Sequence, residues 1–147
     1  MYHLVYVSHA AQAFHEADLL AILNESRANN KKKEITGMLL YLQERFIQVL
    51  EGDEKVVNEL YEEIRKDPRH KKVTLILEGN SPHRLFKDWS MGFKKISESD
   101  FTLLSGFTDI EKFFAVPPTD SEGSAVMIFL NLFYKKNFVD YPELNTY

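Results

Sequence analysis

A glutamine and a tyrosine stand out in this sequence of 147 residues, because both lie where side chains should be buried. Gln48 lies between Phe46 and Leu50, on the apolar side of a segment with β-strand alternation. Tyr6 shares a side of the N-terminal segment with Leu4. A buried amide without a partner costs on the order of 1–3 kcal/mol, and a buried phenol also needs one. Each alone is more often a satisfied core group, but together they favour a cofactor cleft with converging polar groups.

The segments that carry these residues predict an α+β fold. Alternating β-formers predict strands, and apolar residues at helical spacing predict helices. The expected strands are 2–8, 35–42, 45–51, 72–78 and 86–94, and the expected helices are 16–29 and 53–66. The order βαββαββ is typical of a ferredoxin-like sandwich with an added strand. We therefore expect a mixed five-stranded sheet with both helices on one face.

Short local signals set the boundaries of these elements. Gln43-Glu44 separates two strands by two residues, which predicts a hairpin although the usual Asn-Gly turn is missing. Asn29-Asn30, followed by three lysines, predicts the end of the first helix, and Asp67-Pro68 the end of the second.

The second face of the sheet also needs a cover. Leu4 and Tyr6 point to one face, and Val5 and Val7 point to the other, so both faces are apolar. The tail can supply this cover. Its expected helical segments are 100–104, 109–116 and 121–136, with Pro117-Pro118 between the last two. We expect the tail to pack on the second face or to form a subunit interface.

Composition excludes several classes of function. Lys and Arg number 18 and Asp and Glu 22, a net charge of −4 that argues against nucleic-acid binding. Cysteine is absent, which excludes disulfides and thiolate chemistry, and the spacing of His3, His9 and His15 matches no metal site. The longest apolar run, at 125–130, is too short to span a membrane. The N-terminal segment alternates and lacks the charged region expected of a signal peptide. We expect a cytoplasmic protein without a metal.

Several short segments resemble the BLUF family of blue-light receptors that use flavin. These are YVS at 6–8, NN at 29–30, ITG at 35–37, FIQVLEG at 46–52, DPRH at 67–70 and WSMGF at 89–93. They occur in the family's order and spacing from about residue 2 to residue 96. The resemblance implies a flavin-binding photosensor domain at 1–96. It implies a C-terminal helical extension at 97–147, as in the short stand-alone members of the PixD type.

The resemblance also implies a role for each matching residue. Tyr6 matches the photoactive tyrosine, and Gln48 the glutamine that bridges it to the flavin, FAD in most members with FMN as an alternative. Trp89 and Met91 match a pair on the last strand that is tied to signalling, and Ser8 a serine close to that tryptophan. The other implied flavin-binding residues are Ser26, Asn30, Ile35, Phe46, Asp67, Arg69 and His70.

These residue types suit a light-driven rearrangement. A tyrosine is a good electron donor to an excited flavin, and its phenol proton can follow the electron. A glutamine amide carries a donor and an acceptor, so rotating or tautomerising it rewires the hydrogen bonds. We expect a small red shift of flavin absorption in the light. The signal would pass through the last strand and the C-terminal helices to a partner protein, and we expect a homo-oligomer without catalytic activity.

Two other classes of function stay open at this point. The first is a flavin redox enzyme, although the sequence has no nicotinamide fingerprint and no evident substrate base. Flavin reduction by NAD(P)H would distinguish it. The second is a scaffold that keeps the fold but does not respond to light, which the absence of bound flavin would favour.

Overall fold

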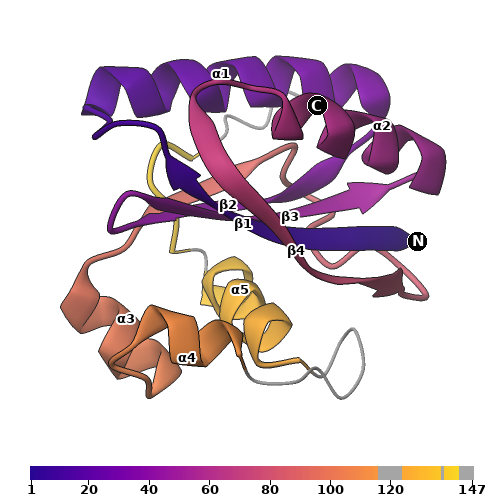
Figure 1. Cartoon of the computed structure of the whole chain (residues 1–147). Helices are drawn as coiled ribbons and strands as arrows, with labels where there is room; N and C mark the ends of the chain where they lie inside the picture. Colours follow the sequence, from indigo (N-terminus) through magenta and orange to yellow (C-terminus); the bar gives the residue numbers. More distant parts are fainter. Residues whose placement is uncertain (116–123, 137, 143–147) are drawn as a thin grey trace.

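The computed structural model describes residues 1–115, 124–136 and 138–142, in which one sheet of five strands lies between two helical layers (Figure 1). The strands are β1 (Tyr2–Ala10), β2 (Thr36–Leu42), β3 (Arg45–Gly52), β4 (His70–Asn80) and β5 (Gly92–Lys95). The helices are α1 (Glu16–Lys33), α2 (Glu54–Arg65), α3 (Glu98–Ser105), α4 (Ile110–Phe114) and α5 (Ala125–Lys136). The described helices include none that is long and apolar enough to cross a membrane.

The strand order β4-β1-β3-β2-β5 confirms the predicted ferredoxin-like sheet with an added strand. Central β3 pairs antiparallel with β1 and with β2, while β5 pairs parallel with β2, so the sheet is mixed. Gln48 on β3 is directly opposite Tyr6 on β1 and Leu39 on β2. Residues opposite one another share a face of the sheet, so this register places the glutamine and the tyrosine side by side.

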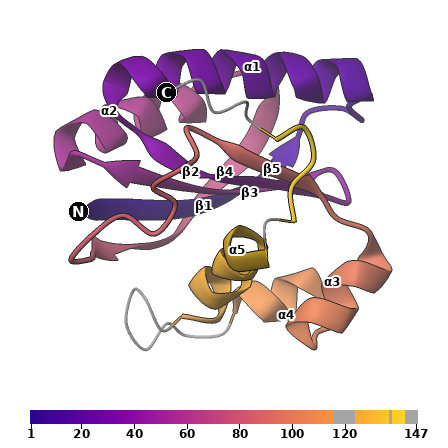
Figure 2. The same cartoon turned by 180° about the vertical axis from the view of Figure 1, so that it is seen from behind.

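Helices α1 and α2 cover one face of the sheet, and α3, α4 and α5 lie on the other (Figures 1 and 2). Leu4 and Tyr6 belong to the core under α1 and α2, as the alternation predicts. Val5 belongs to the second core, where residues of α3, α4 and α5 pack. The prediction that the tail covers the second face is therefore confirmed. Residue 116, Pro117-Pro118 and residues 121–123 lie outside the described residues.

The predicted hairpin is confirmed, but the predicted end of the first helix is wrong. Gln43 and Glu44 have φ angles of 50° and 60°, the two positive values of a type I′ turn. Helix α1 continues through Asn29 and Asn30 and ends at Lys33, where the capping residue Glu34 is left-handed at φ 55°. The lysines of the last turn suit the negative end of the helix dipole, so they extend the helix instead of stopping it.

The predicted strand 86–94 is also wrong, since only Gly92–Lys95 pairs as a strand. The carboxylate of buried Glu51 accepts hydrogen bonds from the backbone N–H groups of Leu85, at 2.9 Å, and Phe86, at 2.6 Å. The N–H of Gly37 donates to the carbonyl of Trp89 at 3.1 Å. These long-range bonds hold the segment as an irregular loop. Trp89 and Met91 therefore lie before the last strand rather than on it.

Candidate functional site

A cleft of about 240 Å³ opens between α1 and α2, with β-strand side chains as its floor. Its apolar lining residues are Ile22, Leu39, Phe46, Leu60 and Ile64. Its polar lining residues are Tyr6, Glu25, Ser26, Asn29, Asn30, Gln48, Glu63, Asp67, Arg69 and His70. A cleft that combines apolar side chains with many converging polar groups suits an aromatic ligand with a polar edge.

Tyr6 and Gln48 form a hydrogen-bonded pair at the buried end of the cleft. The Tyr6 hydroxyl donates to Gln48 Oε1, and the exposed fractions of the two residues are only 3% and 5%. Burial, and then the nearby Tyr61 and Asp67, raise the pKa of the Tyr6 phenol far above its usual range. The phenol therefore keeps its proton at all ordinary pH values. Gln48 Nε2 donates in turn to the sulfur of Met91 at 3.3 Å.

Met91 and Trp89 lie on opposite faces of the sheet. Met91 is fully buried in the core under α1 and α2. Trp89 packs against the second core, where its ring meets that of Tyr134 on α5 edge-to-face at 4.7 Å between centroids. The absence of a side chain at Gly92 makes room for this ring, because a Cβ there would lie 2.5 Å from the indole. In this structure methionine, and not tryptophan, contacts the glutamine.

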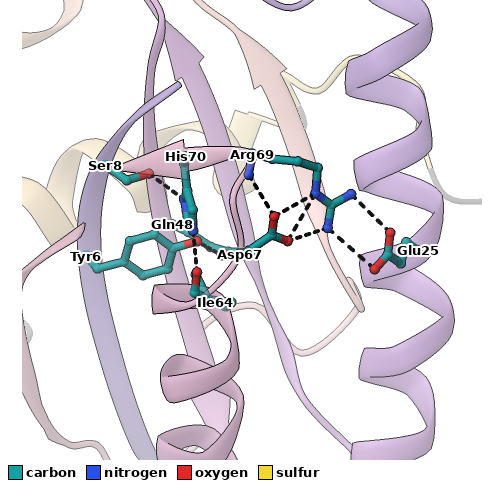
Figure 3. A network of polar contacts seen from close by, with 8 residues as sticks. All are labelled: Tyr6, Ser8, Glu25, Gln48, Ile64, Asp67, Arg69 and His70. Atoms are coloured by element: carbon teal, nitrogen blue, oxygen red, sulfur yellow. Dashed lines mark hydrogen bonds and ion pairs between the residues drawn. The ribbon is translucent and has the colours of Figure 1, made fainter. Parts of the chain in front are cut away.

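His70 joins the site to the end of α2 (Figure 3). Its Nδ1 lies 2.9 Å from Ser8 Oγ, and its Nε2 bonds the carbonyl of Ile64. A carbonyl only accepts, so His70 donates to Ile64 through Nε2, while Nδ1 lies within hydrogen-bond distance of the Ser8 hydroxyl. Ser8 thus lies on the α1/α2 face with His70. The expected proximity of Ser8 to Trp89 is absent, because Trp89 packs on the other face.

An ion-pair cluster forms the rim of the cleft (Figure 3). The guanidinium of Arg69 bonds both carboxylate oxygens of Asp67, with a shortest contact of 2.6 Å, and reaches Glu25 on α1 at 3.1 Å. These hydrogen bonds from Arg69 lower the pKa of the Asp67 carboxyl despite its partial burial. The cluster is more exposed than the floor, since the side chain of Arg69 is 40% accessible and that of Glu25 57%. Arg69 links the loop after α2 to α1 across the opening.

Helix α1 contributes amides and a hydroxyl to the cleft. Buried Asn30 donates through Nδ2 to the carbonyl of Ser90 at 2.8 Å, and Asn29 and Ser26 lie on the same wall. The helix continues through Asn29-Asn30, which places both side chains on this wall. Ile35, expected to line the pocket, is instead buried in the core of this face and is not among the lining residues.

Several lining residues were missed by the motif comparison. They are Ile22, Glu25, Leu39, Leu60, Glu63 and Ile64. A helical period would have found part of this set, because Ile22, Ser26 and Asn29 recur at i, i+4 and i+7 on one face of α1. The described residues contain no cluster of three or more side chains that could hold a metal ion.

Comparisons with known proteins agree with this geometry. The model of the family described as BLUF, sensors of blue-light using FAD, matches residues 1–92. The photoactivated adenylate cyclase subunit beta of Euglena gracilis is 32% identical over 126 residues, which cover 79% of this chain and 14% of that protein. The corresponding subunit alpha is 39% identical over 83 residues, 56% of this chain and 8% of that protein. This chain thus spans a small part of these cyclase subunits.

Solved structures of BLUF proteins also match most of the chain. The dark-state structure of the BLUF protein BlrB has a TM-score of 0.68 and 31% identity, and the match covers 87% of this chain and 94% of that one. The photo-activated state of BlsA has a TM-score of 0.70 and 28% identity, with 99% of both chains covered. The chain belongs to the BLUF family of flavin-based blue-light sensors.

Proposed function

We propose that this chain is a blue-light photoreceptor that holds FAD, or alternatively FMN, non-covalently in the cleft between α1 and α2. The observation that carries the proposal is the buried series Tyr6–Gln48–Met91 at the floor of that cleft. The fold does not require the Gln48 amide at this position, since an apolar side chain would fill the same volume. Its position at the end of an open cleft supports a role in sensing a bound ligand.

The residues of the cleft suit a flavin. The apolar side chains of Ile22, Leu39 and Ile64 would flank the ring, and Asn30 would meet its polar edge. Ser26 and Phe46 would lie near the ring. Asp67, Arg69 and His70 would face the more polar parts of the flavin. When bound, the flavin supplies absorption of blue light and accepts an electron from a nearby donor.

The protein's part in the response begins at Tyr6. Its buried phenol is neutral and hydrogen-bonded to Gln48 Oε1, so loss of an electron to a bound flavin would let the phenol proton move along this bond. Tyr6 would regain both when the electron returns, which leaves only the hydrogen bonds changed. Gln48 then rotates or tautomerises, which exchanges the donor and acceptor ends of its amide. Either change alters whether the glutamine donates a hydrogen bond to Met91 Sδ. The new arrangement is stored in hydrogen bonds and reverses in the dark.

The output is a change of protein contacts rather than catalysis. We propose a photosensor domain at residues 1–96, with residues 97–147 as the extension that carries the signal to a partner protein. Trp89 supports this route, because its ring packs on Tyr134 of that extension while Met91 contacts the glutamine. Absence of cysteine and of a membrane-spanning helix among the described residues supports a cytoplasmic site of action. We also propose a homo-oligomer: one chain covers both of its own sheet faces, so the exposed apolar side chains of Leu103 and Ile128 on the extension support it.

Gln48→Leu tests the proposal through the visible spectrum in the dark, under blue light and during dark recovery. The wild-type flavin bands should shift slightly to the red and return. The variant should keep its flavin, because leucine fills a similar volume, but lose the shift. Asn131→Leu on α5 is the matched control, since it removes an amide on the other face and should keep a normal shift. A normal shift in Gln48→Leu would contradict the proposal, and rapid reduction of the flavin by NAD(P)H would favour a redox enzyme.

A further inference from the structure

A second set of contacts leads away from Gln48 along the backbone of the Met91 segment. The carbonyl of Met91 accepts a hydrogen bond from Arg27 Nε of α1 at 3.0 Å. The same guanidinium donates through a terminal nitrogen to the carbonyl of Tyr141 at 2.7 Å. Arg27 therefore joins Met91, which contacts the glutamine, to Tyr141, which lies 114 positions beyond Arg27 itself. Neither contact belongs to the wall of the cleft.

Tyr141 belongs to a segment that we call the C-terminal strap, residues 138–142. The strap leaves the α5 side of the sheet, passes along β5 and reaches α1 (Figure 2). The backbone N–H of Asp140 donates to the carbonyl of Phe93 at 2.7 Å, and Asp140 Oδ2 accepts from the N–H of Lys95 at 2.8 Å. Lys94 adds an ion pair with Asp140 at 3.3 Å. The strap thus covers the outer edge of β5 and links both helical layers.

The strap is held by partly exposed contacts and against a local backbone cost. Tyr141 has a φ of 50°, which is unfavourable for a bulky residue and persists only where surrounding contacts impose it. Its ring stacks on Phe93 at 6.0 Å, and its hydroxyl bonds Glu16. Because the side-chain contacts of Asp140 and Tyr141 are partly exposed, the strap can change between docked and released states at a modest free-energy cost.

We propose that Arg27 is a positioning residue that couples the Gln48–Met91 contact to docking of the C-terminal strap. The coupling rests on the proposed photoreceptor function, since light supplies the change at Gln48. The rigid guanidinium of Arg27 can bond the carbonyls of Met91 and Tyr141 together only while the distance between these two carbonyls stays the same. A shift of Met91 after Gln48 rearranges therefore weakens the Arg27–Tyr141 bond. Light then favours the released strap, which exposes the edge of β5.

Hydrogen–deuterium exchange of the flavin-loaded full chain tests this coupling. The reporters are the amides of Asp140 and Lys95, since each bonds across the strap and β5. In the wild type, exchange at both amides should rise in blue light, by about fivefold or more. In Arg27→Ala, exchange should already be high in the dark and change little in the light, while the red shift persists. Arg27→Lys should resemble Arg27→Ala, because one ammonium cannot replace the fork.

Two controls separate this role from a general loss of structure. Arg65→Ala removes another arginine, one that bonds Glu62 on the exposed side of α2, and should leave exchange at the strap unchanged. Asp140→Ala removes the side-chain contacts of the strap with β5 and leaves its contacts with α1 in place. Because the docked strap favours the dark arrangement of Gln48 and Met91, its loss should slow the dark recovery of the red shift by about fivefold or more.

The outcomes distinguish the coupling from the photoreceptor function on which it rests. A wild-type red shift without any light-dependent exchange at the strap would overturn the coupling and leave the photoreceptor intact. A wild-type light response of the strap in Arg27→Ala would also overturn it. Absence of the red shift in the wild type would contradict the photoreceptor function itself. Should Arg27→Ala fail to fold, an unchanged recovery rate in Asp140→Ala would still refute the coupling.

Discussion

The two faces of the sheet are both buried and both carry aromatic side chains, but they differ in how those side chains are packed. On the α3–α5 face, the rings of Phe101, Phe113, Phe129 and Phe133 meet edge-to-face in a continuous cluster. On the α1/α2 face, buried side chains include polar groups that hydrogen-bond in series, and the two helices leave a cleft between them. A dense aromatic core holds one arrangement, whereas a glutamine amide can exchange its donor and acceptor ends by rotation. The comparison assigns stability to one face and switching to the other.

The segment before β5 is where the two faces meet. Met91 contacts Gln48 on the switching face, and Trp89, two residues earlier, packs on Tyr134 on the stable face. A regular strand would have placed both side chains on the same face. The irregular loop instead connects the Tyr6–Gln48 pair with the helical extension.

Tyr6→Phe should have the largest effect on the switching face. The variant keeps the ring but removes the hydroxyl that donates to Gln48, so the red shift should be lost completely. Tyr61→Phe is the matched control, because its ring lies 5.7 Å from that of Tyr6 and its loss of a hydroxyl should leave the red shift in place. Visible difference spectra of both variants check this. Loss of the shift in both would show that the buried pair is not the determining feature.

Phe129→Ala should have the largest effect on the stable face. Its ring is 3% exposed and contacts three other phenylalanine rings, so truncation leaves a cavity. We expect the free energy of unfolding to fall by about 3–5 kcal/mol while the remaining folded protein keeps its red shift. Urea unfolding and the difference spectrum measure the two quantities on one sample. A destabilised protein that also loses the shift would contradict the division between the faces.

Trp89→Phe should cause a smaller loss. The variant keeps an aromatic ring but weakens the edge-to-face contact with Tyr134, at a cost of about 0.5–1.5 kcal/mol. The dark spectrum of the flavin should not change, since the indole lies on the far face from the cleft. The light signal at α5 should weaken, measured as light-dependent exchange in residues 125–136. A shifted dark spectrum would place the tryptophan near the flavin instead.

Asp67→Asn should give the smallest effect, and only as a function of pH. The pKa of Asp67 is lower in the folded protein than in the unfolded chain, so its carboxylate stabilises the fold at pH values above the unfolded pKa. This contribution is lost as the pH falls through the folded pKa. The partly exposed pair with Arg69 contributes at most about 1 kcal/mol. Urea unfolding between acidic and neutral pH should show this dependence in the wild type and a weaker one in the variant.

The sequence predicts the sheet and its two faces because hydrophobic alternation acts locally. Leu4 and Tyr6 on one side, and Val5 on the other, lie as their spacing requires. The segment 86–94 could not be predicted, since bonds from Glu51 and Gly37 hold it out of the sheet. These partners lie far away in the chain, so no local pattern reveals them.

The site shows the same division between local and long-range information. Gln48 and Tyr6 are identifiable as polar residues in apolar strands, and the order of the strands places β1 beside β3. The register that sets the two residues opposite one another is fixed only in the folded sheet. Arg27 carries no such signal, because an arginine late in a helix suits the helix dipole whatever else it contacts. Its link between Met91 and Tyr141 exists only in the folded chain.

The light-minus-dark visible spectrum of the purified, flavin-loaded wild-type protein tests the central claim most directly. The Tyr6–Gln48 pair beside the cleft predicts a small red shift of the flavin bands under blue light that returns fully in the dark. A flavin that bleaches under blue light, or whose bands never move, would contradict a hydrogen-bond switch at Gln48.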